Sequence, residues 1–163
     1  MAPTEVSGPD MNAIYDVATY DQRNGVAHLL GRVKAELMIG FDQELARHPE
    51  LAELEVSSAQ FSILSALSLG LADSASQLCK GIQYDAGAMT RMIDRLEAKG
   101  LIRRSRSEAD RRLVNLELTE AGHAAVPKLR EVSVAVLNRY LQGFSQAEVR
   151  QLEGFLRRML EQA

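Results

Sequence analysis

The stretch from Asp85 to Leu118 constrains the fold most, because a helical and an alternating apolar pattern follow one another there. Its first part, AGAMTRMIDRLEAK, places apolar residues on one helix face, with Asp85 as N-cap and Gly100 at the usual stop position. Its last part, LVNLEL, alternates apolar and polar residues, which is typical of a half-buried strand. With LIRRSR as the first strand and SEADRR as the tip, the sequence predicts a helix followed at once by a hairpin, or wing.

Two more short helices are predicted before this unit. Ser57 or Ser58 can cap the first, which ends at Gly70, and Asp73 or Ser74 can cap the second, SASQLCKGI. Three short helices joined by tight turns match a helix-turn-helix in length and order. Together with the hairpin they predict a winged helix-turn-helix.

The N-terminal part of the chain carries a long helical pattern. Apolar residues recur at helical spacing from about residue 12 to residue 47, with a possible break near Gly25. The helix should end near His48, because Pro49 disfavours helix in the residue before it.

The C-terminal part is also helical. Thr119 can cap a long helix in which Pro127 predicts a kink or a later start, and Ser145 with Glu148 forms a capping box for a last helix. The apolar faces of the N- and C-terminal helices hold more apolar surface than a small domain needs. We therefore expect these helices to pack against each other and against a second copy of the chain. The sequence thus predicts a mainly α fold with a small β-hairpin. Its expected parts are a flexible tail (1–10), an N-terminal dimerisation helix (11–50), the winged helix-turn-helix (51–122) and C-terminal dimerisation helices (123–163).

Length and composition limit the class of protein. The 163 residues suit one domain or two small ones, and 46% apolar residues are enough for a core. There is no run of about 18 apolar residues and no basic, apolar start typical of a secretory signal. A single cysteine, Cys79, fits a reducing compartment. We therefore expect a cytoplasmic protein without a membrane span.

Charge is unevenly distributed along a chain whose net charge is −3. The segment 91–112 holds eight basic and four acidic residues, a net charge of +4, whereas the segment 1–56 holds four basic and ten acidic residues, a net charge of −6. One compact positive segment on an acidic chain is typical of a phosphate-binding surface. A solvated charged face without a partner is the alternative.

The helix that begins after Asp85 has the residues that a major-groove helix needs. Small side chains at its start permit close approach, Thr90 and Arg91 can reach bases or phosphates, and Arg95 can reach phosphate one turn further on. The alternative is that alanine and glycine are simply good turn and helix-surface residues. The predicted DNA contacts on this helix are Asp85, Ala86, Gly87, Ala88, Thr90, Arg91 and Arg95.

The hairpin supplies a second group of predicted contacts. An arginine of the tip, Arg111 or Arg112, can enter a narrow minor groove, where the potential is strongly negative. Asp110 can pair with Arg112 and fix its direction. Arg104 and Arg106, with Arg103, would lie on the rising strand near the DNA backbone.

Three stretches together closely resemble the multiple-antibiotic-resistance regulator (MarR) family: VSSAQFSILSAL, SASQLC and GAMTRMIDRLEAKGLIRRSRSEADRRLVNLELTEAG. The resemblance is dense from Val56 to about Gly122. It implies a triangular homodimer held by the terminal helices, with the recognition helix in the major groove and a wing arginine in the minor groove. Members usually bind pseudo-palindromic promoter sites, often repress, and often release DNA when a small phenolic or aromatic acid binds. The two-fold axis needs half-sites about one helical turn apart.

The resemblance also implies an effector pocket lined by the first, second and fifth helices of the family. His28 and Arg32 are four residues apart on one helix face, and an arginine in a mostly apolar pocket suits an aromatic carboxylate. Gln60 would add a polar contact. The alternative is that Arg32 is an ion-pair partner and His28 a structural histidine.

Other functions have less support in the sequence. Peroxide-sensing members of the family carry their reactive cysteine in the first helix, whereas Cys79 occupies an apolar position before the recognition helix, which favours a packing role over redox sensing. The three histidines are scattered, so no metal or other cofactor is expected. No phosphate loop, nucleophile elbow or metal-binding helix motif indicates an enzyme. A protein-interaction module without DNA binding stays open, and neutralising Arg91, Arg111 and Arg112 would distinguish it.

Overall fold

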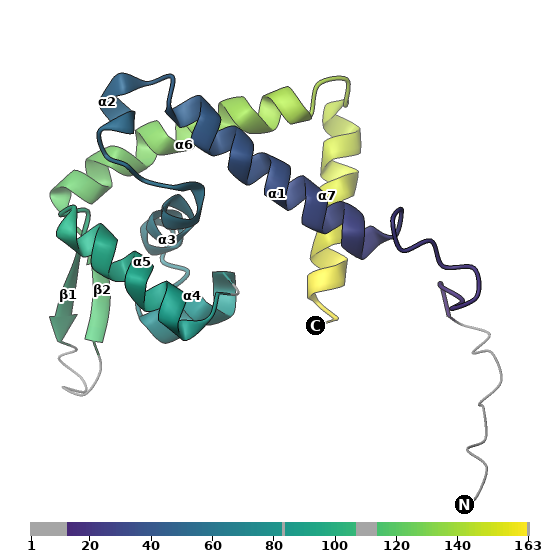
Figure 1. The fold of residues 1–163 in the computed structure, drawn as a ribbon, viewed down its shortest axis with the longest axis horizontal. Coiled ribbons are helices and arrows are strands. Elements are labelled where there is room, and N and C mark those ends of the chain that lie inside the picture. The colour runs from purple at the N-terminus through teal and green to yellow at the C-terminus, as the bar shows by residue number, and fades with distance from the viewer. Residues whose placement is uncertain (1–12, 83, 107–113, 163) are drawn as a thin grey trace, which may run out of the picture. The chain divides into compact units, whose positions relative to one another are not determined.

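The computed structural model describes residues 13–82, 84–106 and 114–162, and the predicted tail at 1–10 lies outside these ranges. The chain divides into two compact units, 1–36 and 37–163, which are described separately below. Among the described residues no helix is long and apolar enough to cross a membrane. The elements are α1 (Val26–Leu45), α2 (Pro49–Ala52), α3 (Ser58–Ser68), α4 (Ala75–Ile82), α5 (Ala86–Ala98), β1 (Ile102–Arg106), β2 (Val114–Leu118), α6 (Glu120–Tyr140) and α7 (Gln146–Leu160) (Figure 1). This confirms the predicted mainly α fold with a hairpin.

The predicted start of the first helix near residue 12 is wrong, whereas the possible break predicted near Gly25 is confirmed. Helix α1 begins only at Val26, after Gly25. Upstream, the carboxylates of Asp16 and Asp21 accept backbone N–H groups two residues on, at 2.7 and 2.9 Å. Such aspartate turns compete with helix for the backbone donors, so helical spacing of the apolar residues does not suffice there.

The end of α1 also differs from the prediction. The helix stops at Leu45, and a separate short helix, α2, begins at Pro49 with His48 as its N-cap. Proline suits the first turn of a helix because it has no N–H to leave unpaired. Pro49 therefore starts a helix here as well as helping to end one.

Ser57, not Ser58, is the N-cap of α3. The Ser57 hydroxyl accepts the Gln60 N–H at 3.3 Å, and Gln60 Oε1 accepts the Ser57 N–H at 3.1 Å, which makes a capping box. The Ser58 N–H already donates to the Asp42 carboxylate of α1 at 2.8 Å. That contact joins the end of α1 to the start of α3.

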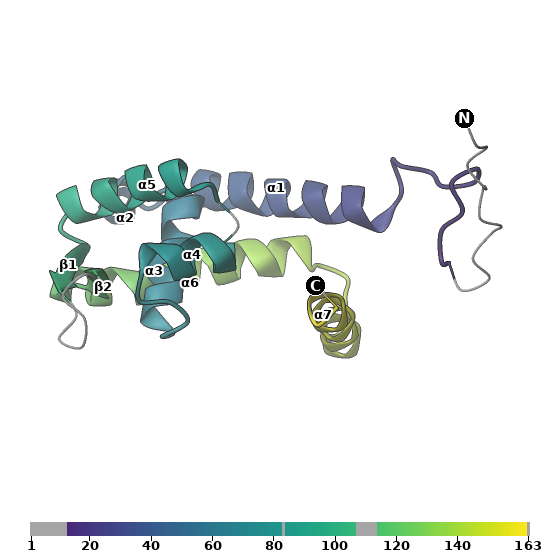
Figure 2. The ribbon, with the colours of Figure 1, turned by 90° about the horizontal axis from the view of Figure 1, so that it is seen from below.

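The core lies where α3, α4, α5, α6 and β2 meet (Figures 1 and 2). Helix α5 faces it with Met89, Ile93 and Leu96, as its periodicity predicts. Each fully buried aliphatic side chain of this kind stabilises the fold by about 1.5–3 kcal/mol. The largest side chains with almost no exposed surface are Val56, Ile63, Leu64, Leu78, Met89, Ile93, Leu96, Leu101, Ile102, Val126 and Leu129.

Helix α5 ends in a way that sets the hairpin directly behind it. Gly100 has φ +68°, its N–H donates to Glu97 O at 2.8 Å, and the Leu101 N–H donates to Leu96 O at 3.0 Å. These two bonds form a Schellman motif, which satisfies the last carbonyl groups of the helix and turns the chain sharply. The predicted glycine stop is confirmed, and β1 begins at Ile102.

The two strands are antiparallel, with Ile102 opposite Leu118 and Arg106 opposite Val114. Ile102, Leu116 and Leu118 are buried, whereas Val114 is exposed near the tip. The Leu116 N–H donates to Asp73 O at 2.7 Å, so the segment before α4 lies along the free edge of β2. The wing is thereby tied to the helix-turn-helix, and its predicted tip at 107–113 lies outside the described residues.

Helix α6 starts immediately after Thr119, whose hydroxyl accepts the Gly122 N–H at 3.1 Å. The helix continues through Pro127, so the alternative of a later start is wrong. Pro127 is exposed, and the carbonyl that loses its helical partner can be hydrated on that side. The capping box of Ser145 and Glu148 that opens α7 is confirmed.

Candidate nucleic-acid interface

The residues that α5 buries determine which of its residues face outward. Because Met89, Ile93 and Leu96 point into the core, Arg91 and Arg95 are directed to the surface, and neither makes an ion pair with any described residue. A Cβ atom added at Gly87 would lie 3.4 Å from Arg91 Nη1, so this guanidinium lies close over the glycine. These two cations, one helical turn apart and without an ion pair to the described residues, form the positive part of this face.

The other predicted residues of α5 are engaged in the start of the helix. The Asp85 carboxylate accepts the Ala88 N–H at 2.9 Å, which fixes the first turn. The Thr90 hydroxyl donates to Ala86 O at 2.8 Å, which leaves its lone pairs free to accept. Ala86 and Gly87 are exposed and Ala88 is half-buried, so the helix presents little side-chain bulk at its start.

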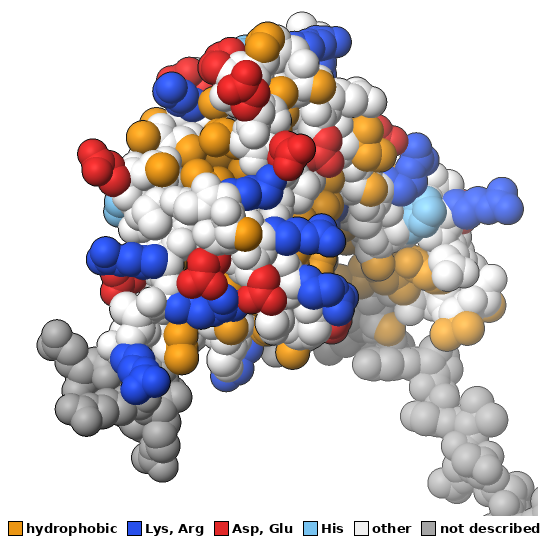
Figure 3. All heavy atoms as spheres, turned by 60° about the vertical axis from the view of Figure 1, so that its left-hand side comes forward, with side chains coloured by type: hydrophobic (Ala, Val, Ile, Leu, Met, Phe, Trp, Pro, Cys, Tyr) orange, Lys and Arg blue, Asp and Glu red, His pale blue; other side chains and the backbone are white. Residues whose placement is uncertain are grey.

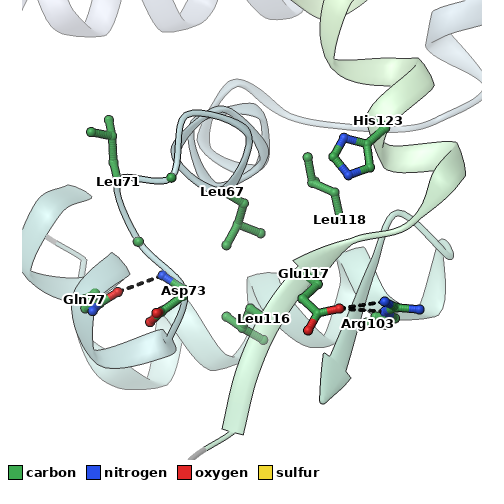
Figure 4. Close-up of a pocket in the computed structure, with 11 residues that line it drawn as sticks. Leu67, Leu71, Asp73, Gln77, Arg103, Leu116, Glu117, Leu118 and His123 are labelled. Carbon is green, nitrogen blue, oxygen red and sulfur yellow. Dashed lines mark hydrogen bonds and ion pairs between the residues drawn. The ribbon is translucent and has the colours of Figure 1, made fainter. Parts of the chain in front are cut away.

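The three arginines of β1 differ in what they contact. Arg104 Nη2 is 2.5 Å from Asp94 Oδ1, and its Nη1 pairs with Glu97 Oε2. Arg103 pairs with Glu117 across the hairpin at 2.7 Å (Figure 4). Arg106 is exposed and makes no ion pair with a described residue.

Two pKa values reflect these pairs. The hydrogen bond to Asp94 is the largest cause that raises the pKa of Arg104. Hydrogen bonds from Ser105 Oγ, at 2.6 Å, and from Arg103 lower the pKa of Glu117. Each group is therefore held in its charged form by its partners.

The basic surface is consequently smaller than the sequence suggests. Lys99 Nζ donates to the carbonyl groups of Leu54 and Glu55 at 2.8 and 3.0 Å and pairs with the Glu55 carboxylate. Figure 3 shows Lys and Arg side chains on the face that carries the hairpin, with Asp and Glu side chains among them. Within the described part of this surface the unpaired cations of α5 and β1 are Arg91, Arg95 and Arg106. Asp110, Arg111 and Arg112 lie outside the described residues.

The residues predicted for an effector lie in both units. His28 and Arg32 are exposed on α1, in the 1–36 unit. Gln60 belongs to the 37–163 unit and is buried, with its Oε1 engaged in the capping box of α3. Cys79 is partly buried and packs against the core, as predicted for a packing residue. The described residues hold no group of three or more His, Cys, Asp or Glu side chains that could bind a metal.

An open hollow of about 540 Å³ lies between the end of α3, the start of α4 and β2 (Figure 4). Its apolar wall includes Leu67 and Leu116. Several of its polar groups already have partners: Gln77 Oε1 accepts the Asp73 N–H at 2.7 Å, and Arg103 pairs with Glu117. Asp73 and His123 also line the hollow.

Sequence reasoning missed the pairing of Arg104 with α5. Asp94 and Glu97 are three residues apart, which places them on one side of a helix, and Arg104 follows shortly after the glycine stop. This spacing was a usable signal, because the tight turn at Gly100 brings β1 back along α5.

The family model of the MarR family matches residues 56–114. The multiple antibiotic resistance protein MarR of Escherichia coli (strain K12) is 32% identical over 111 residues, which cover 68% of this chain and 77% of that protein. The HTH-type transcriptional repressor NicR of Pseudomonas putida is 32% identical over 126 residues, 75% of this chain and 76% of that protein. A structure described as the mechanism for regulation of DNA binding of Bordetella bronchiseptica BpsR by 6-hydroxynicotinic acid has a TM-score of 0.71 at 28% identity, and covers 86% of this chain and 96% of that one.

Proposed function

The chain belongs to the MarR family of DNA-binding transcription regulators, and we propose that it is a dimeric, effector-released repressor of a pseudo-palindromic promoter site. The observation that carries this proposal is the outward face of α5, where Arg91 and Arg95 make no ion pair with any described residue and the helix starts with small residues. Because the proposed protein binds promoter DNA, we expect it to act in the cytoplasm.

Helix α5 is the recognition helix of this proposal. A helix in the major groove reads bases mainly from its N-terminal half, and arginine there pairs with guanine through two hydrogen bonds. Arg91 takes that role, while Thr90 and Arg95 contact bases or phosphate. Asp85 holds the helix start, and Ala86, Gly87 and Ala88 let the backbone approach the DNA.

The wing completes the DNA interface. Arg106 on β1 contacts the DNA backbone, and an arginine of the tip, Arg111 or Arg112, enters the minor groove, with Asp110 as the proposed partner of Arg112. Arginine is favoured there because a narrow minor groove concentrates negative potential. The winged helix-turn-helix at 51–122 thus contacts two adjacent grooves.

A second copy of the chain covers the apolar surface of the terminal segments, 11–50 and 123–163. Helix α7 has no buried residue, and Leu152, Phe155 and Met159 are between 42% and 50% exposed. On α1, Leu29 and Val33 are similarly exposed. Exposed apolar side chains along α7, and separately along α1, support an interface with another protein. Two-fold symmetry then requires half-sites about one helical turn apart.

The effector of this proposal is a small aromatic acid or phenolic compound. Support comes from the BpsR structure, whose description names regulation of DNA binding by 6-hydroxynicotinic acid, and from Arg32, an exposed arginine one turn from His28. A guanidinium binds a carboxylate through two parallel hydrogen bonds. Gln60 belongs to the other unit and has its Oε1 in the capping box of α3, so the proposal rests on Arg32 and His28.

A panel of aromatic acids should contain a compound that raises the unfolding temperature and releases the protein from its DNA. At one hundred times its dissociation constant such a ligand adds about 2.7 kcal/mol to the free energy of unfolding. Arg32→Met should abolish both responses and keep DNA binding, whereas Lys34→Met on the same helix should keep both. Differential scanning fluorimetry and mobility-shift titration measure the two responses. A full response by Arg32→Met, or no active compound, would remove the effector assignment and leave the DNA interface intact.

A further inference from the structure

We propose that Arg104 is a positioning residue, which Asp94 and Glu97 hold so that the wing keeps a fixed orientation relative to the recognition helix α5. We call these three residues the clamp. The inference rests on the proposed function, because it concerns where the wing meets the DNA. It replaces the predicted role of Arg104 as a DNA contact.

The clamp holds Arg104 through both terminal nitrogens of its guanidinium and through its backbone N–H. Its Nη2 lies 2.5 Å from Asp94 Oδ1, and its Nη1 pairs with Glu97 Oε2. The backbone N–H of Arg104 also donates to Glu97 Oε1 at 3.3 Å. A planar guanidinium can hold two carboxylates in fixed directions, which a lysine ammonium cannot do as rigidly.

The position of the clamp on β1, between the base and the tip of the hairpin, explains why it affects the direction of the wing. Leu101 and Ile102 anchor the base of the hairpin because both are buried. Arg104 lies two residues further towards the tip, where it contacts the carboxylates of Asp94 and Glu97 on α5. A strand extends about 3.3 Å per residue, so a change of direction at Arg104 grows along β1 towards the tip. Glu97 also occupies a backbone N–H on the edge of β1 that does not pair with β2.

Charge distinguishes the clamp from a phosphate contact. One guanidinium between two carboxylates leaves a net charge of −1, which repels phosphate. A phosphate bound at Arg104 would have to displace Asp94 or Glu97, whose side chains are 55% and 37% exposed while that of Arg104 is 34% exposed. Arg106 lies two residues on, on the same face of the strand, and has no ion pair with a described residue, so it is better placed for phosphate.

The double variant Asp94→Asn with Glu97→Gln separates the two roles by the sign of its effect. If Arg104 contacts phosphate, removing two acids beside it should tighten DNA binding and steepen its salt dependence. If Arg104 is a positioning residue, the preference for the specific site over random DNA should fall by about tenfold, the size expected for losing charge-assisted hydrogen bonds. Hydroxyl-radical footprinting should then lose minor-groove protection at the flanks. Protection of guanine N7 in the major groove against methylation by dimethyl sulfate should remain.

A milder variant keeps the test informative if the double variant folds poorly. Arg104→Lys retains the positive charge but cannot hold both carboxylates, so the clamp predicts reduced flank protection, whereas a phosphate contact predicts unchanged affinity. Arg103→Met is the matched control, because it breaks a pair within the hairpin (Figure 4) and should leave the clamp in place. Tighter binding by the double variant with an unchanged preference for the specific site, or a complete footprint by both Arg104→Lys and the double variant, overturns the proposal. If the wild-type protein itself gives no specific footprint, the proposed function fails and the clamp's role in DNA binding fails with it.

Discussion

Replacing Arg91 with alanine should weaken binding to a specific DNA site by about 1–3 kcal/mol for each half-site, the range for an arginine that pairs with guanine through two hydrogen bonds. Arg91 is exposed on the outward face of α5 and is not drawn into an ion pair with any described residue, so its donors are free for a base. Titration of labelled DNA at two salt concentrations measures the loss, and competition with random DNA measures the change in specificity.

Arg130→Ala is the matched control for this variant, since Arg130 is exposed on α6 and plays no part in the proposed DNA interface. It should bind like the wild type. An equal loss by Arg91→Ala on specific and random DNA would reassign Arg91 to phosphate. No loss would remove Arg91 from the interface and favour the protein-interaction alternative.

Replacing Gly122 with alanine should destabilise the fold by about 3 kcal/mol, at the upper end of the range for overpacking. The added Cβ atom would lie 2.1 Å from the carbonyl oxygen of Leu101. That oxygen also accepts the Thr119 N–H at 3.1 Å, and the Thr119 hydroxyl donates to Gly100 O at 2.6 Å, so this backbone cannot move without losing the junction between wing and α6. Chemical denaturation followed by circular dichroism measures the loss.

Gly81→Ala provides the opposite expectation in the same assay. Gly81 lies in α4, and a Cβ atom there would meet no atom within 4 Å. Alanine should therefore stabilise the helix by about 0.5–1 kcal/mol, through its lower backbone entropy in the unfolded chain. Equal stability of Gly122→Ala and wild type would show that α6 does not pack against Leu101 as described.

Local chemistry made much of the fold predictable. Asp85, Thr119 and Ser145 were recognised as caps because each precedes a helical pattern and can accept a backbone N–H. Gly100 was recognised as a stop because its position requires a positive φ. These rules act within a few residues, so the sequence alone contains the information they need.

Contacts between distant residues were less predictable. The net charge of +4 on 91–112 indicated a basic surface, yet Arg103, Arg104 and Lys99 are each paired with an acid or a carbonyl group. Composition counts charges but does not show which are neutralised across a turn. The start of α1 was missed for a related reason, because the side chains of Asp16 and Asp21 take backbone donors that a helix would use.

We propose that the winged helix-turn-helix at 51–122 recognises a specific promoter sequence as a dimer. A mobility-shift titration with the intergenic DNA upstream of the chain's own gene, followed by footprinting, tests it most directly. We expect salt-sensitive binding that resists random competitor DNA, with two protected half-sites about one helical turn apart. Absence of specific binding there, together with no enriched sequence from a random DNA pool, would contradict it.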